Sequence, residues 1–91
     1  MPVFFDHHTR MPPMSPETME QARKMLDQMR EDIRAKTKDK FGVTPINVYT
    51  GINGDSWCLN EAPTADAIIK SHEARGVKLT IKDITQITLF V

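Results

Sequence analysis

The 91-residue chain has a single cysteine and no excess of either charge sign. Cys58 has no second cysteine with which to form an internal disulfide. Twelve Lys and Arg residues balance twelve Asp and Glu residues, and they are not gathered into one basic face. Binding to nucleic acid is therefore not expected. No apolar run approaches the roughly 20 residues that a membrane span needs, so no membrane partner is expected either.

The amino-terminal sequence and the length of the chain limit its location and its organisation. The start Met-Pro-Val-Phe-Phe is too short and too uncharged for a secretory signal peptide, which predicts a cytoplasmic protein. A chain of 91 residues is long enough for one modest core and too short for two. We therefore expect a single domain over residues 1–91.

A first helix is predicted from about residue 16 to about residue 36. Ser15 can cap the first amides, and Pro16 suits the first turn because its missing N–H needs no partner there. Apolar residues then recur every three or four positions, the spacing of one buried helical face. These residues are Met19, Ala22, Leu26, Met29 and Ile33. We expect this stripe to face the core.

Strands are predicted on both sides of that helix. Residues 3–9 and 43–50 are rich in β-branched and aromatic residues and show no helical period. The Gly and Asn residues of segment 51–55 suit a hairpin, which leads into a partner strand over residues 56–62. The first half of the chain thus reads strand, helix, hairpin.

The last third of the chain predicts a second helix and a final strand. Thr64 caps the helix, Gly76 ends it, and His72 lies on its apolar face. A capping box over 80–83 precedes a strand over 85–91. The complete order predicts an α+β fold of the ferredoxin-like βαββαβ kind, in which two helices cover one face of an antiparallel sheet.

This topology gathers polar residues that lie far apart in the sequence. The second helix returns over the end of the first strand, so we expect His72 near Asp6, His7 and His8. Two imidazoles and a carboxylate suit a divalent metal such as Ni, Cu or Zn. Two other interpretations stay open: a hydrogen-bonded core histidine beside a solvated strand end, and acid–base catalysis.

Three residues of the third strand are also candidates for a role. Cys58 is expected to be a small buried residue, because no second cysteine or adjacent base predicts a reactive thiolate. Glu61 closes the strand at the end opposite His8 and is expected to cap or pair locally. Asn60 needs a partner in a pocket or across a dimer interface. We keep His7, Cys58 and Glu61 as possible additional ligands.

The chain resembles a family of small bacterial nickel-binding-like proteins, long catalogued as a domain of unknown function. The resemblance rests on Phe4-Phe5-Asp6-His7-His8, on Trp57-Cys58-Leu59-Asn60-Glu61-Ala62-Pro63, and on His72 in a following helix. Asp6, His8, His72 and the Cys-Leu-x-Glu-Ala-Pro strand match the family pattern, and the resemblance covers nearly the whole chain. It implies a dimeric ferredoxin-like domain that binds nickel.

The resemblance also bears on strand orientation, and the chain departs from the family at one point. The residues alone leave open which face of the first strand is covered. Relatives tolerate charged residues at the positions of Val3 and His7, which implies that Phe4, Asp6 and His8 face the helices. Members of the family often carry a further histidine in helix one, whereas this helix has none.

Three functions are compatible with these residues. The first is binding of nickel or another divalent transition metal by Asp6, His8 and His72, for metal storage or buffering. The second is a small-ligand-binding protein or an enzyme of the dimeric α+β-barrel type, with His72 as general base oriented by Asp6. An open pocket of a few hundred Å³ beside His72 would support this function, whereas a collapsed apolar environment there would reject it. Of the two, a protein that is not an enzyme is the one that we expect. The third is a structural or regulatory interaction domain with a closed hydrogen-bond network.

A homodimer is also expected. Two helices cover one face of a sheet and leave the other bare, with Val3 and Phe5 on it if Asp6 and His8 face inward. Burial of apolar area stabilises by roughly 25 cal/mol per Å², and two-fold pairing is the commonest way to achieve it. The predicted partners are therefore a second copy of the chain and a metal ion or small molecule.

Overall fold

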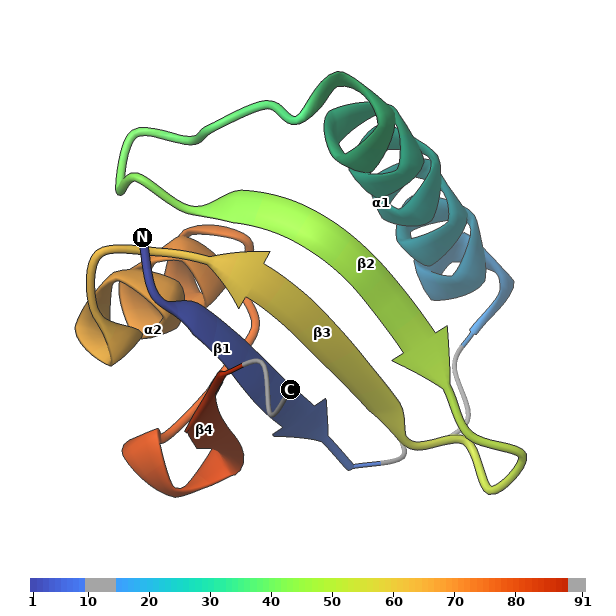
Figure 1. Ribbon diagram of the computed structural model, residues 1–91. Coiled ribbons are helices and arrows are strands. Elements are labelled where there is room, and N and C mark those ends of the chain that lie inside the picture. The colour runs from blue at the N-terminus through green and yellow to red at the C-terminus, as the bar shows by residue number, and fades with distance from the viewer. Residues whose placement is uncertain (10–14, 89–91) are drawn as a thin grey trace.

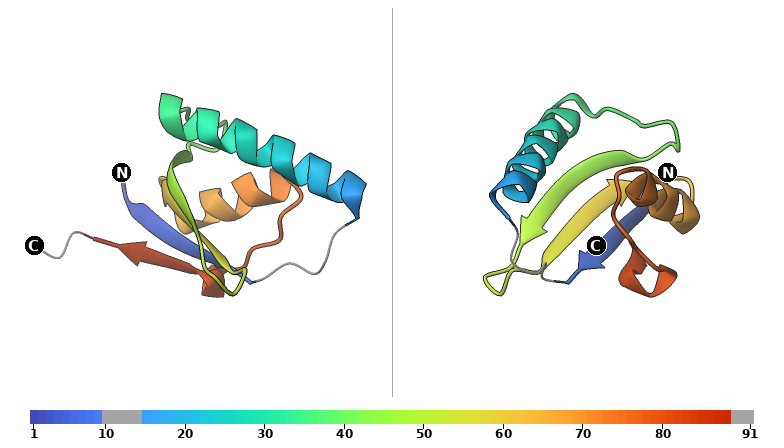
Figure 2. Two further views of the ribbon diagram at one scale, coloured as in Figure 1. Left: turned by 90° about the vertical axis from the view of Figure 1, so that its right-hand side faces the viewer. Right: turned by 180° about the vertical axis from the view of Figure 1, so that it is seen from behind.

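The computed structural model describes residues 1–9 and 15–88. Its elements are β1 (Val3–His8), α1 (Pro16–Ala35), β2 (Thr44–Thr50), β3 (Ser56–Glu61), α2 (Ala65–Ala74), the 3-10 turn η1 (Ile81–Asp83) and β4 (Ile84–Ile87). The strands form one antiparallel sheet in the order β2-β3-β1-β4, and both helices lie on one side of it (Figures 1 and 2). The predicted ferredoxin-like sandwich is confirmed. The predicted last strand extends over residues 89–91, which lie outside the described residues.

The predicted helix ends are confirmed, and local chemistry explains them. The Ser15 hydroxyl accepts a hydrogen bond from the Thr18 amide at 3.3 Å, and the Thr64 hydroxyl accepts one from the Ala67 amide at 3.2 Å. Each bond satisfies an amide that has no partner within the helix. Gly76 adopts a φ of +79° just beyond α2, a conformation that glycine adopts without strain. The chain then turns toward η1 and β4.

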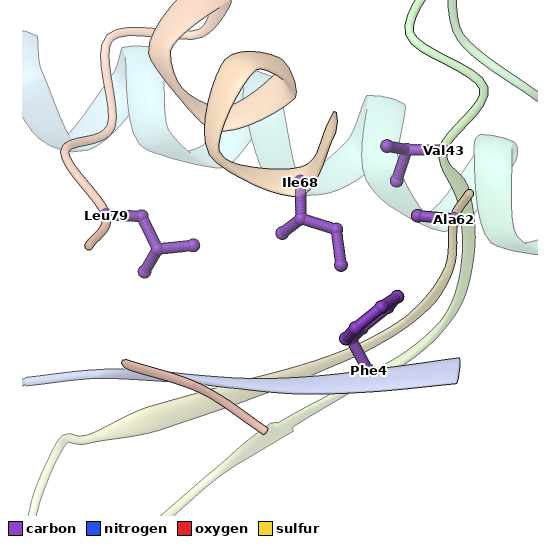
Figure 3. Close-up of a cluster of buried hydrophobic side chains, with 5 residues drawn as sticks. All are labelled: Phe4, Val43, Ala62, Ile68 and Leu79. Atoms are coloured by element: carbon purple, nitrogen blue, oxygen red, sulfur yellow. The ribbon is translucent and has the colours of Figure 1, made fainter. Parts of the chain in front are cut away.

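The buried core lies between α2 and the sheet. It consists of Phe4, Val43, Ala62, Ile68 and Leu79 (Figure 3). Ile68 extends from α2 toward the sheet and, like Ala62, is completely buried. Helix α2 is therefore anchored over the central strands, and the residues that follow Ile68 in that helix are held close to β1.

Helix α1 does not have the predicted buried stripe. The side chains of Met19 and Leu26 are 58% and 48% exposed, and no residue of α1, which the structure describes completely, is buried. The helix lies along β2, at the edge of the sheet (Figure 1), so the sheet covers only part of its apolar face. A spacing of three and four identifies the apolar face of a helix, but it does not determine how much surface the partner offers.

The pairing of β1 with β3 sets which side chains face the helices. Phe4 is opposite Asn60, and Asp6 is opposite Cys58. All four of these residues are buried. We call this side of the sheet, toward α1 and α2, the inner face, and the opposite side the outer face. The orientation of β1 implied by the family resemblance is thus the one observed.

None of the described helices is both long enough and apolar enough to span a membrane. The longest, α1, has 20 residues, and charged side chains occur along its whole length.

Candidate metal centre

Four side chains from three elements converge on the inner face. Asp6 and His8 come from β1, Cys58 from β3 and His72 from α2, and one potential ligand atom of each lies within 4.8 Å of the others. Asp6, Cys58 and His72 are buried, and the His8 side chain is 17% exposed. The predicted proximity of His72 to Asp6 and His8 is therefore present. The role of these residues as ligands stays a prediction.

The Asp6 carboxylate is at the centre of the cluster. Its Oδ2 atom lies 2.5 Å from His8 Nε2 and 3.3 Å from His72 Nε2. Its Oδ1 atom accepts a hydrogen bond from the Asn60 amide at 3.1 Å. Burial alone would raise the pKa of Asp6, but the interactions with His72 and His8 outweigh burial and lower this pKa to about 2. The carboxylate is therefore ionised at neutral pH.

The backbone of α2 determines which nitrogen of His72 faces the cluster. His72 Nδ1 lies 2.8 Å from the carbonyl oxygen of Ile68, one helical turn earlier. A carbonyl can only accept, so Nδ1 carries a hydrogen in this contact. In the neutral ring, Nε2 then presents a lone pair to the Asp6 carboxylate. This arrangement, with one nitrogen donating to a carbonyl and the other bare, is typical of metal-ligating histidines.

Cys58 is both a buried side chain, as expected, and a member of the cluster. Its sulfur lies 3.5 Å from His8 Nε2. Burial, together with the charge of Asp6, raises the pKa of the thiol to about 12. His8 is thus a base adjacent to Cys58, which the sequence alone does not indicate. The raised pKa nevertheless disfavours a nucleophilic thiolate, because the thiol stays protonated near neutral pH.

His7 and Glu61, the other two possible ligands, lie away from the cluster. His7 Nε2 is 2.9 Å from Asp55 Oδ2, and the His7 ring stacks on Trp57 with centroids 5.1 Å apart. Glu61 lies opposite Val3, at the end of β3 away from His8, which is the predicted position in the strand, and its side chain is on the outer face. The expected capping or local pairing of its side chain stays a prediction. Neither residue belongs to the group of possible ligands among the described residues.

Two partners of the cluster are not predicted by the sequence. Asn60 lines a pocket, one of the two places expected for it, but its partner is Asp6 of the cluster itself. Its position two residues after Cys58 was a signal, since residues two apart in a strand share a face. The carbonyl of Ile68 is the other partner, and no side-chain pattern marks a backbone atom as important.

A pocket of about 240 Å³ lies beside the cluster on the same face. Cys58 and Asn60 line it, and so does Ser71, the residue before His72 in α2. His72 itself is not among the lining residues. The pocket therefore adjoins the cluster through β3, while the imidazole of His72 points elsewhere.

Comparison with known proteins supports the fold and goes no further. No family model and no curated protein matches the chain. A solved crystal structure, that of SCO4226 from Streptomyces coelicolor A3(2), is similar to this chain with a TM-score of 0.59. Sequence identity is 23%, and the similarity covers 98% of this chain and 99% of that one. At this identity, the likeness shows a shared fold alone.

Proposed function

We propose that this protein binds a divalent transition metal through Asp6, His8 and His72, with Cys58 as a further ligand. The supporting observation is that His8 Nε2 and His72 Nε2 both lie near one carboxylate oxygen, Asp6 Oδ2. Nδ1 of His72 already holds a hydrogen for Ile68. For Nε2 to donate to Asp6 as well, His72 must carry a second proton. A positive charge between Asp6 and His72 satisfies both groups, and either a second proton on His72 or a metal ion can supply it.

The donor set fits such an ion. Imidazole nitrogens and a thiolate suit nickel, copper and zinc, whereas oxygen-rich sites suit magnesium and calcium. The Cys58 thiol, which is protonated in the metal-free protein, would lose its proton to become a ligand, because a coordinating metal ion deprotonates a thiol. Asn60 hydrogen-bonds to Asp6, and the Ile68 carbonyl hydrogen-bonds to His72. Hydrogen bonds of this kind hold the ligands of metal sites in place. The site does not need a histidine from α1, because its four possible ligands come from β1, β3 and α2. The family resemblance favours nickel, and storage or buffering is the role that we propose.

Metal binding is favoured over a function in which His72 acts as a general acid or base. Both ring nitrogens of this residue are engaged, one with Ile68 and one with Asp6. The side chain is only 4% exposed and does not line the adjacent pocket. A general base must reach the proton that it abstracts, and the imidazole of His72 is shielded from a substrate in that pocket.

Titration calorimetry of the metal-free protein with nickel, copper and zinc tests the proposal. We expect one ion per chain, together with release of protons, seen as a dependence of the heat on the buffer. Removal of a residue that only hydrogen-bonds to a metal ligand lowers metal affinity about 10- to 100-fold. A His8→Ala, His72→Ala double variant, which removes two ligands, should therefore lose more than about 100-fold in affinity. His7→Ala is the matched control, because its histidine lies on the outer face, and it should bind as the parent does.

Two results would contradict metal binding at this cluster. One is the absence of binding tighter than about 100 μM for all three ions. The other is equal affinity in the parent and the double variant. If His72→Ala lowers the free energy of unfolding by about 1–3 kcal/mol while no ion binds the parent, the cluster is a structural hydrogen-bond network instead.

We further propose that two copies of the chain pair through the outer face. Partly buried or exposed apolar and aromatic side chains gather there: Val3, Phe5, Tyr49, Trp57, Leu59 and Ile87. Phe5 and Tyr49 stack on this face with ring centroids 6.0 Å apart and form an aromatic patch. The net charge of the chain is zero, so two copies approach without net repulsion.

Sedimentation at micromolar concentration tests the pairing. We expect twice the chain mass of 10.4 kDa for the parent. Phe5→Lys places a charge in the outer face and should yield the single-chain mass, whereas Lys82→Ala, a change of an exposed side chain in η1, should not. A parent that sediments as one chain rules out the dimer. A Phe5→Lys variant that is folded and still dimeric places the interface elsewhere.

A further inference from the structure

The pocket beside the cluster is small, and both apolar and charged residues line it. It is lined by residues of α1, the segment after it, β2, β3 and α2, and it opens to solvent beside Arg75. Its apolar lining consists of Met29, Phe41, Val43, Pro45, Val48 and Ala74. Its volume of about 240 Å³ is below the range of roughly 300–1,000 Å³ typical of sites for drug-sized ligands. A small molecule with a short apolar part fits such a space.

The acidic groups of the pocket already have partners in the fold. Asp39 Oδ1 accepts hydrogen bonds from the amides of Phe41 and Val43 at 2.9 and 3.0 Å. Its Oδ2 accepts one from the Ser71 hydroxyl at 2.5 Å. Asp32 accepts a hydrogen bond from Gln28 at 3.1 Å. Asp39 thus ties the loop before β2 to α2, and it is committed to structure rather than to a ligand.

The basic groups of the pocket are less engaged. Arg75, at the end of α2, makes one long hydrogen bond of 3.4 Å from Nε to the carbonyl of Ser71. Lys40 lies over the Phe41 ring, with Nζ 5.1 Å from its centroid. Among the residues that the structure describes, no carboxylate lies within ion-pair distance of either cation. The terminal nitrogens of Arg75 are therefore available to an anion.

We propose that this pocket binds a small organic carboxylate, with the carboxylate group on Arg75 and a short apolar tail against the pocket wall. A guanidinium matches a carboxylate in shape and can donate two parallel hydrogen bonds to it. The apolar lining provides the affinity for the tail, and the limited volume restricts its length.

The pocket also adjoins the proposed metal centre, which predicts coupling between the two. Cys58 and Asn60 line the pocket, while the Cys58 sulfur is 3.5 Å from His8 and the Asn60 amide bonds to Asp6. A cation on one side of these residues attracts an anion on the other, and each strengthens binding of the other by the same factor. Binding of the carboxylate does not itself rest on the proposed metal function. Only the coupling does.

Titration of the metal-free protein with butyrate tests the proposal, with the chemical shifts of the backbone amides recorded by NMR at each butyrate concentration. We expect saturable shifts at Ser71, Arg75 and Val48, and no saturable shifts with butyramide, which has the same tail without the charge. Arg75→Gln should weaken butyrate binding about tenfold or more. Arg23→Gln is the matched control, because Arg23 is exposed on α1 and is paired with Glu20. It should bind butyrate as the parent does.

A second variant and a second titration complete the test. Ala74→Met fills the pocket without removing a charge and should also weaken butyrate binding. Equal shifts with butyrate and butyramide, or an unchanged affinity in Arg75→Gln, would overturn the proposal. Butyrate could instead shift the Arg75 amide without shifting that of Val48, and bind Ala74→Met as tightly as the parent. That result would show charge pairing at the surface instead of binding in the pocket, and it would also overturn the proposal. If butyrate binds equally with and without nickel, the coupling is refuted while the carboxylate site stands.

Discussion

The two faces of the sheet place neighbouring histidines in opposite environments. On the inner face, His8 is close to a fully buried carboxylate, a thiol and a second imidazole. On the outer face, His7 pairs with Asp55 and stacks on Trp57, and its side chain is 39% exposed. Both faces thus contain a histidine paired with an aspartate. The difference is the layer above the sheet: α2 covers the inner pair, so that Asp6 is fully buried and His8 is 17% exposed, and it adds His72.

The comparison predicts that only the inner aspartate affects metal binding. Asp6→Asn removes the buried charge and keeps the shape of the side chain, so nickel affinity should fall by on the order of 100-fold or more, because a ligand is lost. Asp55→Asn makes the same chemical change on the outer face and should leave the affinity unchanged. Calorimetric titration measures both. An equal loss in the two variants would show that the faces do not differ in this way.

The inner aspartate should also make the metal-free fold sensitive to acid. The pKa of Asp6 is lowered from 3.8 to about 2 in the folded protein. A lowered folded pKa stabilises the fold above pH 3.8, and this contribution is lost as the pH falls toward about 2. It amounts to on the order of 2 kcal/mol, and Asp6→Asn should flatten the dependence. Urea unfolding at several pH values measures this. His7→Ala should retain the dependence, and an equally steep profile in Asp6→Asn would exclude Asp6 as its source.

Neighbouring residues of β3 offer a subtler comparison. Asn60 lies on the inner face and orients Asp6 through a hydrogen bond, so Asn60→Ala should weaken nickel binding about tenfold. This is the lower end of the losses caused when a residue that hydrogen-bonds to a metal ligand is removed. Leu59 is next to it in sequence and faces outward, so Leu59→Ala should leave nickel affinity unchanged. Calorimetric titration of both variants measures this difference. A larger loss in Leu59→Ala would mean that metal binding depends on the outer face.

The smallest expected effect concerns the uncovered stripe of α1. Leu26 is 48% exposed, so Leu26→Gln should change the free energy of unfolding by less than about 0.5 kcal/mol. Ile68→Ala removes a fully buried side chain of α2 and should cost about 2–5 kcal/mol. Urea unfolding distinguishes the two. If Leu26→Gln is as destabilising as Ile68→Ala, the apolar stripe of α1 is buried in solution.

Most of the fold was predictable because local signals agreed. Ser15, Thr64 and Gly76 mark helix ends by chemistry that acts within a few residues. Their order along the chain then restricts the topology to few choices. The position of α1 was not predictable in the same way. Met19 and Leu26 carry the periodicity of a buried face, but how far β2 covers them depends on packing across the whole sheet.

The candidate site was predictable in part for a similar reason. Topology alone brings His72 over Asp6 and His8, although 64 positions separate the two histidines. The choice between His7 and His8 needed a face for β1, which the residues alone left open and the family resemblance supplied. The Asn60 contact depends on side-chain conformation within the buried layer. The Ile68 contact involves a backbone atom, which no residue type reveals.

The separation of His8 from His72 would give an ion bound between them a mechanical role. An ion held by both side chains would close a loop of more than sixty residues and fasten the first strand to the second helix. Cross-links that close long loops restrict the unfolded chain, which is the usual account of how disulfides stabilise proteins. This chain has one cysteine and no disulfide. The metal would thus act as a reversible cross-link, which a chelator could remove without any change in redox conditions.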